Sequence, residues 1–175
     1  KRGIEVLLLF ERVDEWLVSR LSEFEGKSLM SIARGDIDLG DLGASEEEKQ
    51  EHAQHKEAFA DITKRVQDAL GDQVKEVRIT ERLTDSPACV VADEDDMSLN
   101  LKRMLKEAGQ SVPDSKPILE LNPKHALVER LKNEVSDEQF ANIAAVLLGQ
   151  AVLAEGGTLV DPTGFVAKLN RLLLS

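Results

Sequence analysis

The stretch SDEQFANIAAVLLGQAVLAEGGTLVDPTGFVAKLNRLLLS, residues 136–175, predicts two apolar helices joined by a short loop. The first helix begins at a capping box, because Ser136 is followed three residues later by Gln139. Glycines at 156–157 end this helix, since glycine adopts the left-handed conformation that closes a helix. An aspartate and a proline at 161–162 then begin the second helix as its N-cap and first-turn residues. We expect the rest of the chain to be organised around this hairpin.

The two predicted helices expose more apolar surface than a lone hairpin can bury. The apolar positions at helical spacing are Phe140, Ile143, Leu147, Leu148, Ala151, Val152, Phe165, Val166, Leu169, Leu172 and Leu173. Two such hairpins related by a two-fold axis would close a four-helix bundle and cover nearly all of them. We therefore predict that these residues form a homodimer interface. The pattern gives equal support to the alternative, in which the rest of the same chain covers both faces.

The composition is that of a globular protein, with 42% hydrophobic and 31% charged residues among 175. Its net charge of -11 has the wrong sign for a protein that binds the phosphate backbone of nucleic acids. No apolar run approaches the roughly 20 residues that span a bilayer, and no signal-peptide pattern is present. The single cysteine, Cys89, lies in a Val-rich stretch typical of a buried thiol in a reducing compartment. Neither a nucleic acid nor a membrane is expected as a partner.

The N-terminal part has the pattern of a β-α-β unit. Apolar residues 4–10 and 27–33 predict two strands, and residues 11–24 between them predict a helix. Such units place their strands in a parallel sheet. The glycine- and aspartate-rich stretch 35–43 is the best candidate for a domain boundary. Because the chain opens with Lys1 and runs directly into a strand, we expect it to be a fragment of a longer protein.

Beyond this boundary the pattern predicts a helical domain with a small sheet, which makes the fold class α+β. The expected elements are a helix over 45–70, strands over 74–80, 88–92 and 117–121, and a short helix that Asn122 and Pro123 begin. The first two strands are separated by a turn around a proline and are expected to form a hairpin. The third strand completes a three-stranded sheet.

Residues 97–109 predict a helix with Met97, Leu101, Met104 and Leu105 on one face. An ordinary core-facing stripe explains this pattern and is the interpretation that the pattern alone favours. The alternative is an exposed binding face, because flexible, polarizable Met and Leu side chains adapt to many different partners.

No catalytic motif is present in the sequence. It contains no phosphate-binding loop, no nucleophile elbow and no paired cysteines. His52 and His55 lie near Glu48 and Glu51 on one predicted helix, but no further ligand or supporting residue is indicated. A solvated charged face explains these four residues better than a metal site. An acid/base enzyme stays open as an alternative, because carboxylates are plentiful although no pair of them stands out.

Several short motifs resemble the bacterial heat shock protein 90 family of molecular chaperones. They are IEVLLL (4–9), VDEW (13–16), RLTD (82–85), DMS (96–98), LELNP (119–123), EGGTL (155–159) and DP (161–162). The resemblance runs through the whole chain. It implies that residues 1–43 end a middle domain and that residues 44–175 form a C-terminal dimerisation domain. It further implies that ATP and magnesium bind in a separate N-terminal domain, so neither a cofactor nor ATP hydrolysis is expected in this chain.

The resemblance also implies roles for particular residues. Client proteins would bind the exposed face of Met97, Leu101, Met104 and Leu105, together with a patch at Glu15 and Trp16. The terminal helices would form the dimeric four-helix bundle. The expected partners are a second copy of the chain, unfolded or partly folded clients and other chaperones, in the cytoplasm. The alternative is a homodimeric scaffold that binds no client.

Overall fold

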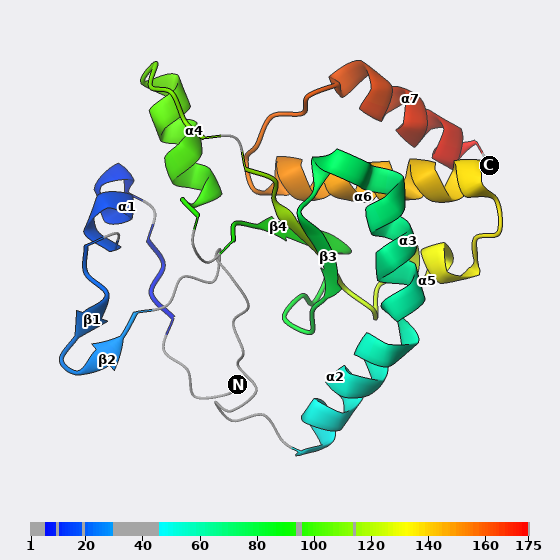
Figure 1. Ribbon diagram of the computed structural model, residues 1–175, viewed down its shortest axis with the longest axis horizontal. Helices are drawn as coiled ribbons and strands as arrows, with labels where there is room; N and C mark the ends of the chain where they lie inside the picture. The colour runs from blue at the N-terminus through cyan, green and yellow to red at the C-terminus, as the bar shows by residue number, and fades with distance from the viewer. Residues whose placement is uncertain are drawn as a thin grey trace.

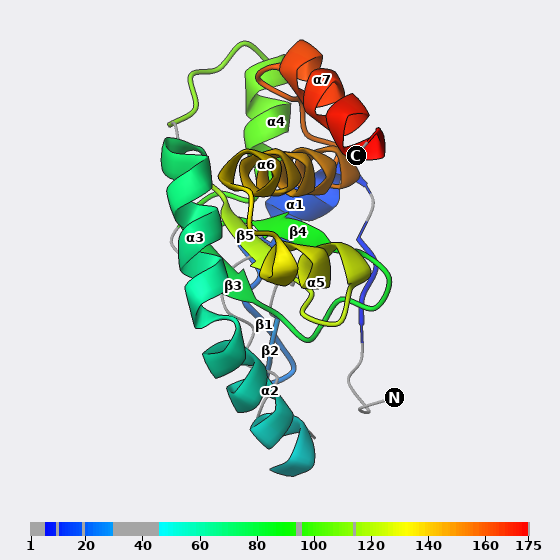
Figure 2. The same ribbon diagram turned by 90° about the vertical axis from the view of Figure 1, so that its right-hand side faces the viewer.

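The computed structural model describes residues 6–9, 11–18, 20–29, 46–93, 96–113 and 115–174. In chain order the elements are α1 (Arg12–Val18), β1 (Glu23–Phe24), β2 (Lys27–Ser28), α2 (Glu46–Ala58), α3 (Ala60–Leu70), the 3-10 helix η1 (Gly71–Gln73), β3 (Glu76–Ile79), β4 (Ala88–Val91), α4 (Leu99–Glu107), β5 (Ile118–Leu121), α5 (Ala126–Asn133), α6 (Asp137–Ala154) and α7 (Pro162–Leu173). The fold is therefore mixed α+β, as predicted. Figures 1 and 2 show a central sheet of β3, β4 and β5, with α6 between that sheet and α7.

The predicted β-α-β unit is wrong in the described residues. Residues 6–9 form no strand, and Leu7 and Leu8 are 60% and 82% exposed. The chain instead forms the short helix α1 and an antiparallel pair of two-residue strands, β1 and β2. The antiparallel pair is joined by a turn at Glu25 and Gly26, whose φ angles of 49° and 77° suit a tight hairpin. The predicted boundary at 35–43 lies outside the described residues.

The helix predicted over 45–70 is divided at Phe59, which separates α2 from α3. Phe59 has φ −106° and ψ 4°, and its side chain is only 2% exposed. α3 buries Val66 and Leu70 against the core. The second half of the predicted helix is thus the part that packs against the core.

The three-stranded sheet has the order β3-β5-β4, so the predicted hairpin between the first two strands is wrong. β5 is the central strand, parallel to β3 and antiparallel to β4. All four residues of β5 are buried, as expected for a strand with neighbours on both edges. β4 and α4 lie between β3 and β5 along the chain, and they provide the long connection that two parallel strands need.

One face of the sheet carries the hydrophobic core. Val77, Leu119 and Val90 point to this face from the three strands, and α3 and α6 cover it. α5 follows β5 and begins at His125, whose ring accepts a hydrogen bond from the backbone N–H of Leu127. The prediction that Asn122 caps this helix is wrong. The Asn122 amide instead bridges the carbonyls of Leu83 and Ser86 in the β3–β4 loop.

α6 is the central helix of the fold, because it contacts α7, β4, α3 and α5. Five residues predicted for the dimer interface lie in the chain's own core: Phe140, Ile143, Leu147, Leu148 and Ala151, none more than 7% exposed. In this structure the chain itself therefore covers most of α6, which was the alternative left open by the sequence. α7 differs, because no residue in it is buried.

Candidate functional site

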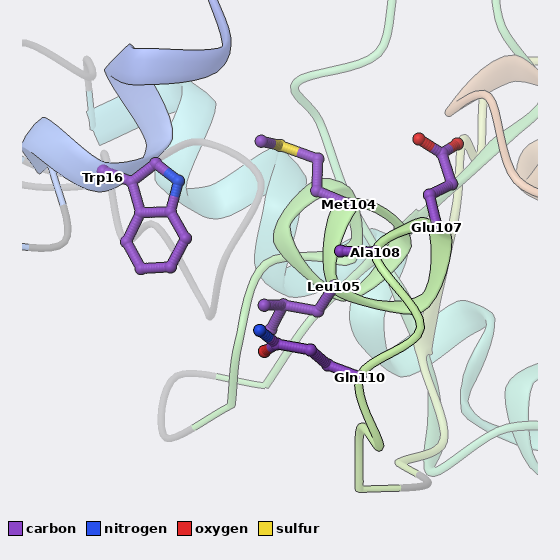
Figure 3. A pocket seen from close by; sticks show the side chains of 6 residues that line it. All are labelled: Trp16, Met104, Leu105, Glu107, Ala108 and Gln110. Atoms are coloured by element: carbon purple, nitrogen blue, oxygen red, sulfur yellow. The ribbon is translucent and has the colours of Figure 1, made fainter.

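A pocket lies between α1 and α4, two helices far apart in the sequence. Its lining residues are Trp16, Met104, Leu105, Glu107, Ala108 and Gln110, and its volume is about 320 Å³. Figure 3 shows the Trp16 indole across the pocket from the side chains of Met104 and Leu105. The structure thus brings together residues that the sequence analysis assigned to two separate client-binding segments.

Residues before and after α4 (Leu99–Glu107) hold this helix in place. The Ser98 hydroxyl accepts a hydrogen bond of 3.1 Å from the backbone N–H of Leu101 and caps the helix. The Lys102 side chain is only 11% exposed, and its ammonium group bonds to Asp96 before the helix and to Ser115 after it. Burial raises the pKa of Asp96, but hydrogen bonds from Lys102, Ser115 and the Met97 amide outweigh it and lower that pKa overall. These bonds hold both ends of α4.

The six predicted client-binding residues are not equally accessible. Trp16 is 54% exposed, and Met97, Met104 and Leu105 are partly buried. Leu101 is only 8% exposed, so it packs inside the structure and is not available on the surface. The Glu15 side chain lies outside the described part. The accessible face is therefore narrower than the predicted stripe and centres on the pocket.

The pocket walls are mainly apolar, and their chemistry suits binding and not catalysis. Trp16, Met104, Leu105 and Ala108 supply the apolar surface, and the lining includes no Lys, Arg, His or Cys. A site built this way offers no acid/base pair and no nucleophile. It can accept an apolar side chain of a partner, and its methionine can adapt to different shapes.

A buried charged cluster lies on the sheet face opposite the core. Glu120 on β5 accepts hydrogen bonds of 2.9 and 2.7 Å from Nε and Nη2 of Arg78, and its other oxygen lies 2.5 Å from Arg82 Nη2. Cys89 occupies the adjacent position on β4, 3.5 Å from the same carboxylate. Burial is the largest cause that raises the pKa of the Cys89 thiol to about 11, and the opposing effect of Arg82 is smaller. The thiol is thus protonated and unreactive near neutral pH.

Of the two histidines on α2, only the side chain of His55 lies in the described part of the structure. Within the described residues no three His, Cys, Asp or Glu side chains gather as metal ligands. Instead, Nδ1 of His55 lies 2.6 Å from the Glu81 carboxylate, which also contacts Lys124 at 3.3 Å. His55 therefore ties α2 to the β3–β4 loop.

A second exposed apolar surface lies on α7 and the end of α6. Leu153, Val166 and Leu173 are 47%, 51% and 74% exposed. Phe165, Leu169 and Leu172 are partly buried, and Leu172 packs against the core, as does Val152 of α6. α7 therefore lies on α6 with one side, and the described residues leave its other side uncovered.

Three pocket residues were not predicted from the sequence: Glu107, Ala108 and Gln110. Ala108 follows Met104 by four positions and could have been added to the stripe by helical spacing. Gln110 lies beyond the end of α4, where helical spacing makes no prediction. The charged pair of Arg78 and Glu120 was not predicted either, although Glu120 belongs to the motif LELNP.

Comparison with known proteins places the chain in a family. A family model described as "Hsp90 protein" matches residues 1–175. The chain belongs to the heat shock protein 90 family, as the sequence motifs predicted.

Within that family the chain is similar to bacterial proteins named "Chaperone protein HtpG". It is 58% identical over 174 residues to the protein of Nitrosomonas europaea and 55% identical over 174 residues to that of Pseudoalteromonas translucida, covering 99% of this chain in both cases. It is 57% identical to the Nitrosococcus oceani protein over 175 residues, which is 100% of this chain. The chain spans 27% of the length of each of these relatives.

In the described residues, no helix has the length and apolar character needed to cross a membrane.

Proposed function

We propose that this chain is the part of a molecular chaperone that binds unfolded or partly folded client proteins and pairs two copies of the molecule. The observation that supports client binding most directly is the pocket in which Trp16 of α1 lies opposite Met104 and Leu105 of α4. Family membership supports the same function, because the relatives are named as chaperones.

The pocket suits unfolded segments for a physical reason. Its volume of about 320 Å³ lies near the lower end of the range for small-ligand pockets, about 300–1,000 Å³, so it has room for a few side chains and not a folded surface. Apolar side chains are exposed in unfolded chains and buried in folded ones. A pocket that binds them through Trp16 and Met104 would hold many sequences weakly and release them when they fold.

The test of client binding is the double variant Met97→Asp/Met104→Asp. Two carboxylates on the binding face should weaken binding of an unfolded protein at least tenfold, because each would have to be desolvated against apolar client groups. The matched control is Gln50→Asp/Gln54→Asp, which adds the same charge on exposed positions of α2, a helix that lies away from α1 and α4 in Figure 1. Equal client affinity in the wild type and the Met97/Met104 variant would contradict the proposal.

We further propose that the uncovered side of α7 pairs with a second copy. Val166 and Leu173 would be buried in that interface, together with Leu169 and the exposed end of α6 at Leu153. Holding two chains together would make contacts between their other parts intramolecular and so raise their effective concentration. A dimeric scaffold without client binding is the second candidate, and the same exposed surface favours it equally.

Val166→Asp/Leu173→Asp tests the dimer. Both side chains are exposed in the single chain, so the variant should keep its fold and lose self-association. Sedimentation equilibrium against the wild type and Gln50→Asp/Gln54→Asp gives the measurement. A double variant that keeps the mass of the wild-type dimer would contradict this interface. Truncation before Ser136 would be a poor test, because α6 supplies much of the core.

The pocket between α1 and α4 is not proposed as a nucleotide-binding site. The pocket lining contains no Lys or Arg to hold a triphosphate, so this pocket does not fit ATP and magnesium. We propose that nucleotide binds in a part of the full-length protein that corresponds to regions of the relatives outside the 27% matched by this chain. By analogy with its family, we place the protein in the cytoplasm.

A further inference from the structure

Arg103 joins the binding helix α4 to the end of the central helix α6. Its Nη1 donates a hydrogen bond of 2.7 Å to the carbonyl oxygen of Gly156, 53 residues away in sequence. Figure 1 shows α4 to one side of the sheet, beside the chain that leaves α6 for α7. Arg103 immediately precedes Met104, which lines the pocket. A displacement of Arg103 would therefore move the pocket wall.

Gly156 is well suited to receive this bond. It has a φ of 71°, so it closes α6 in the left-handed conformation, and a Cβ atom there would run into the Arg103 guanidinium. The backbone N–H groups of Glu155, Gly156 and Gly157 bond back to carbonyls of α6. The C-terminus of a helix carries partial negative charge, which favours a cation such as Arg103.

We propose that the Arg103–Gly156 hydrogen bond links the binding face of α4 to the loop between α6 and α7, so that occupancy of the pocket and the order of that loop change together. Arg103 is then a positioning residue, since it holds Met104 opposite Trp16 without lining the pocket itself. The client part of this inference rests on the proposed function. The bond also connects the two proposed interaction surfaces, because α7 begins directly after this loop.

The linkage has a thermodynamic consequence. If a ligand in the pocket holds α4 in place, the bond to Gly156 forms more often and the end of α6 opens less often. The amides of residues 155–157 report that opening, because their hydrogens exchange only when their bonds to α6 break. Trp16 reports the pocket independently, since it is the single tryptophan of the chain.

The first experiment uses the whole chain without any client and compares Arg103→Met with Lys106→Met. Both residues are exposed cations on α4, but only Arg103 reaches Gly156. Arg103→Met should shift Trp16 emission to longer wavelengths and speed hydrogen exchange at residues 155–157 several-fold, with unchanged circular dichroism. Lys106→Met should change neither quantity, and Arg103→Lys should restore part of both. Wild-type values in Arg103→Met for either quantity would overturn the proposal.

The second experiment adds reduced, carboxymethylated ribonuclease A, an unfolded protein without tryptophan. Binding is followed by the anisotropy of a dye on the ribonuclease, and exchange at 155–157 is measured at saturation. Protection of these amides should rise in the wild type and stay constant in Arg103→Met. Binding without any change in wild-type protection would overturn the linkage and leave the proposed function intact. Absence of binding would count against the proposed function, and the first experiment would then decide the role of the bond.

Discussion

Replacing Glu120 by glutamine should destabilise the fold strongly, because its carboxylate neutralises two arginines at a buried position. The Glu120 side chain is 4% exposed, whereas those of Arg78 and Arg82 are 18% and 23% exposed. Removing one partner of a buried ion pair costs about 3–5 kcal/mol. Because water reaches both arginines in part, we expect a loss near the lower limit, about 3 kcal/mol.

This loss is large enough to measure by thermal or urea unfolding. For a chain of this size, each kcal/mol lowers the midpoint by about 2–4 °C, so Glu120→Gln should melt about 6–12 °C below the wild type. The matched control is Glu76→Gln, an exposed carboxylate on β3 of the same sheet, which should shift the midpoint by less than about 2 °C. Protein concentration is kept constant, because self-association raises the midpoint. A Glu120→Gln midpoint within the range of the control would refute the reasoning.

Two further predictions concern α6 and the thiol. An alanine at Gly149 would place its Cβ against the Phe165 ring, so Gly149→Ala should destabilise the wild type. In the Phe165→Ala variant the ring is gone, and the same substitution should stabilise the fold by up to about 1 kcal/mol, because alanine favours the helix more than glycine does. Urea unfolding measures both effects, and destabilisation in both backgrounds would contradict this contact. Because burial raises the pKa of Cys89 from 9.0 to about 11, the unfolded chain loses the thiol proton first, and stability should fall as the pH rises through that interval. Alkylation at pH 8 should accordingly be far slower in the native than in the urea-unfolded protein, and equal rates would contradict it.

The helices at the C-terminus could be predicted from the sequence because their end residues are local. Ser136 caps α6 by accepting a 3.3 Å hydrogen bond from the Gln139 amide, and Asp161 caps α7 by accepting one of 2.9 Å from Gly164. The capping box is only half formed, however. Glu134, and not Gln139, accepts the hydrogen bond from the Ser136 amide. The spacing of the capping residues thus predicted where the helices begin, but the Glu134 carboxylate makes one of the two capping-box hydrogen bonds in place of Gln139.

The order of the strands could not be predicted, because it depends on contacts between distant residues. β3 and β4 are close in sequence, which favours a hairpin, but the buried strand β5 inserts between them and supplies Glu120 to Arg78. A charged residue within an apolar strand suggests an edge position when it is considered alone. Its partner on another strand makes the central position possible.

The residues that line the pocket were predicted only in part for the same reason. The apolar stripe on α4 was visible in the helical spacing, but the spacing does not say which of its sides is buried. Leu101 faces the interior, whereas Met104 and Leu105 face Trp16. The proximity of α1 and α4 is a tertiary contact, and the sequence of neither helix alone predicts it.

The central claim is that unfolded proteins bind at the pocket between α1 and α4, and methyl and indole NMR tests it most directly. With the Met97 and Met104 methyls and the Trp16 indole labelled, an unfolded protein is titrated into the whole chain. We expect saturable shifts of the Met104 methyl and the Trp16 indole, with a smaller shift at Met97. Binding that leaves Met104 and Trp16 unshifted would contradict it.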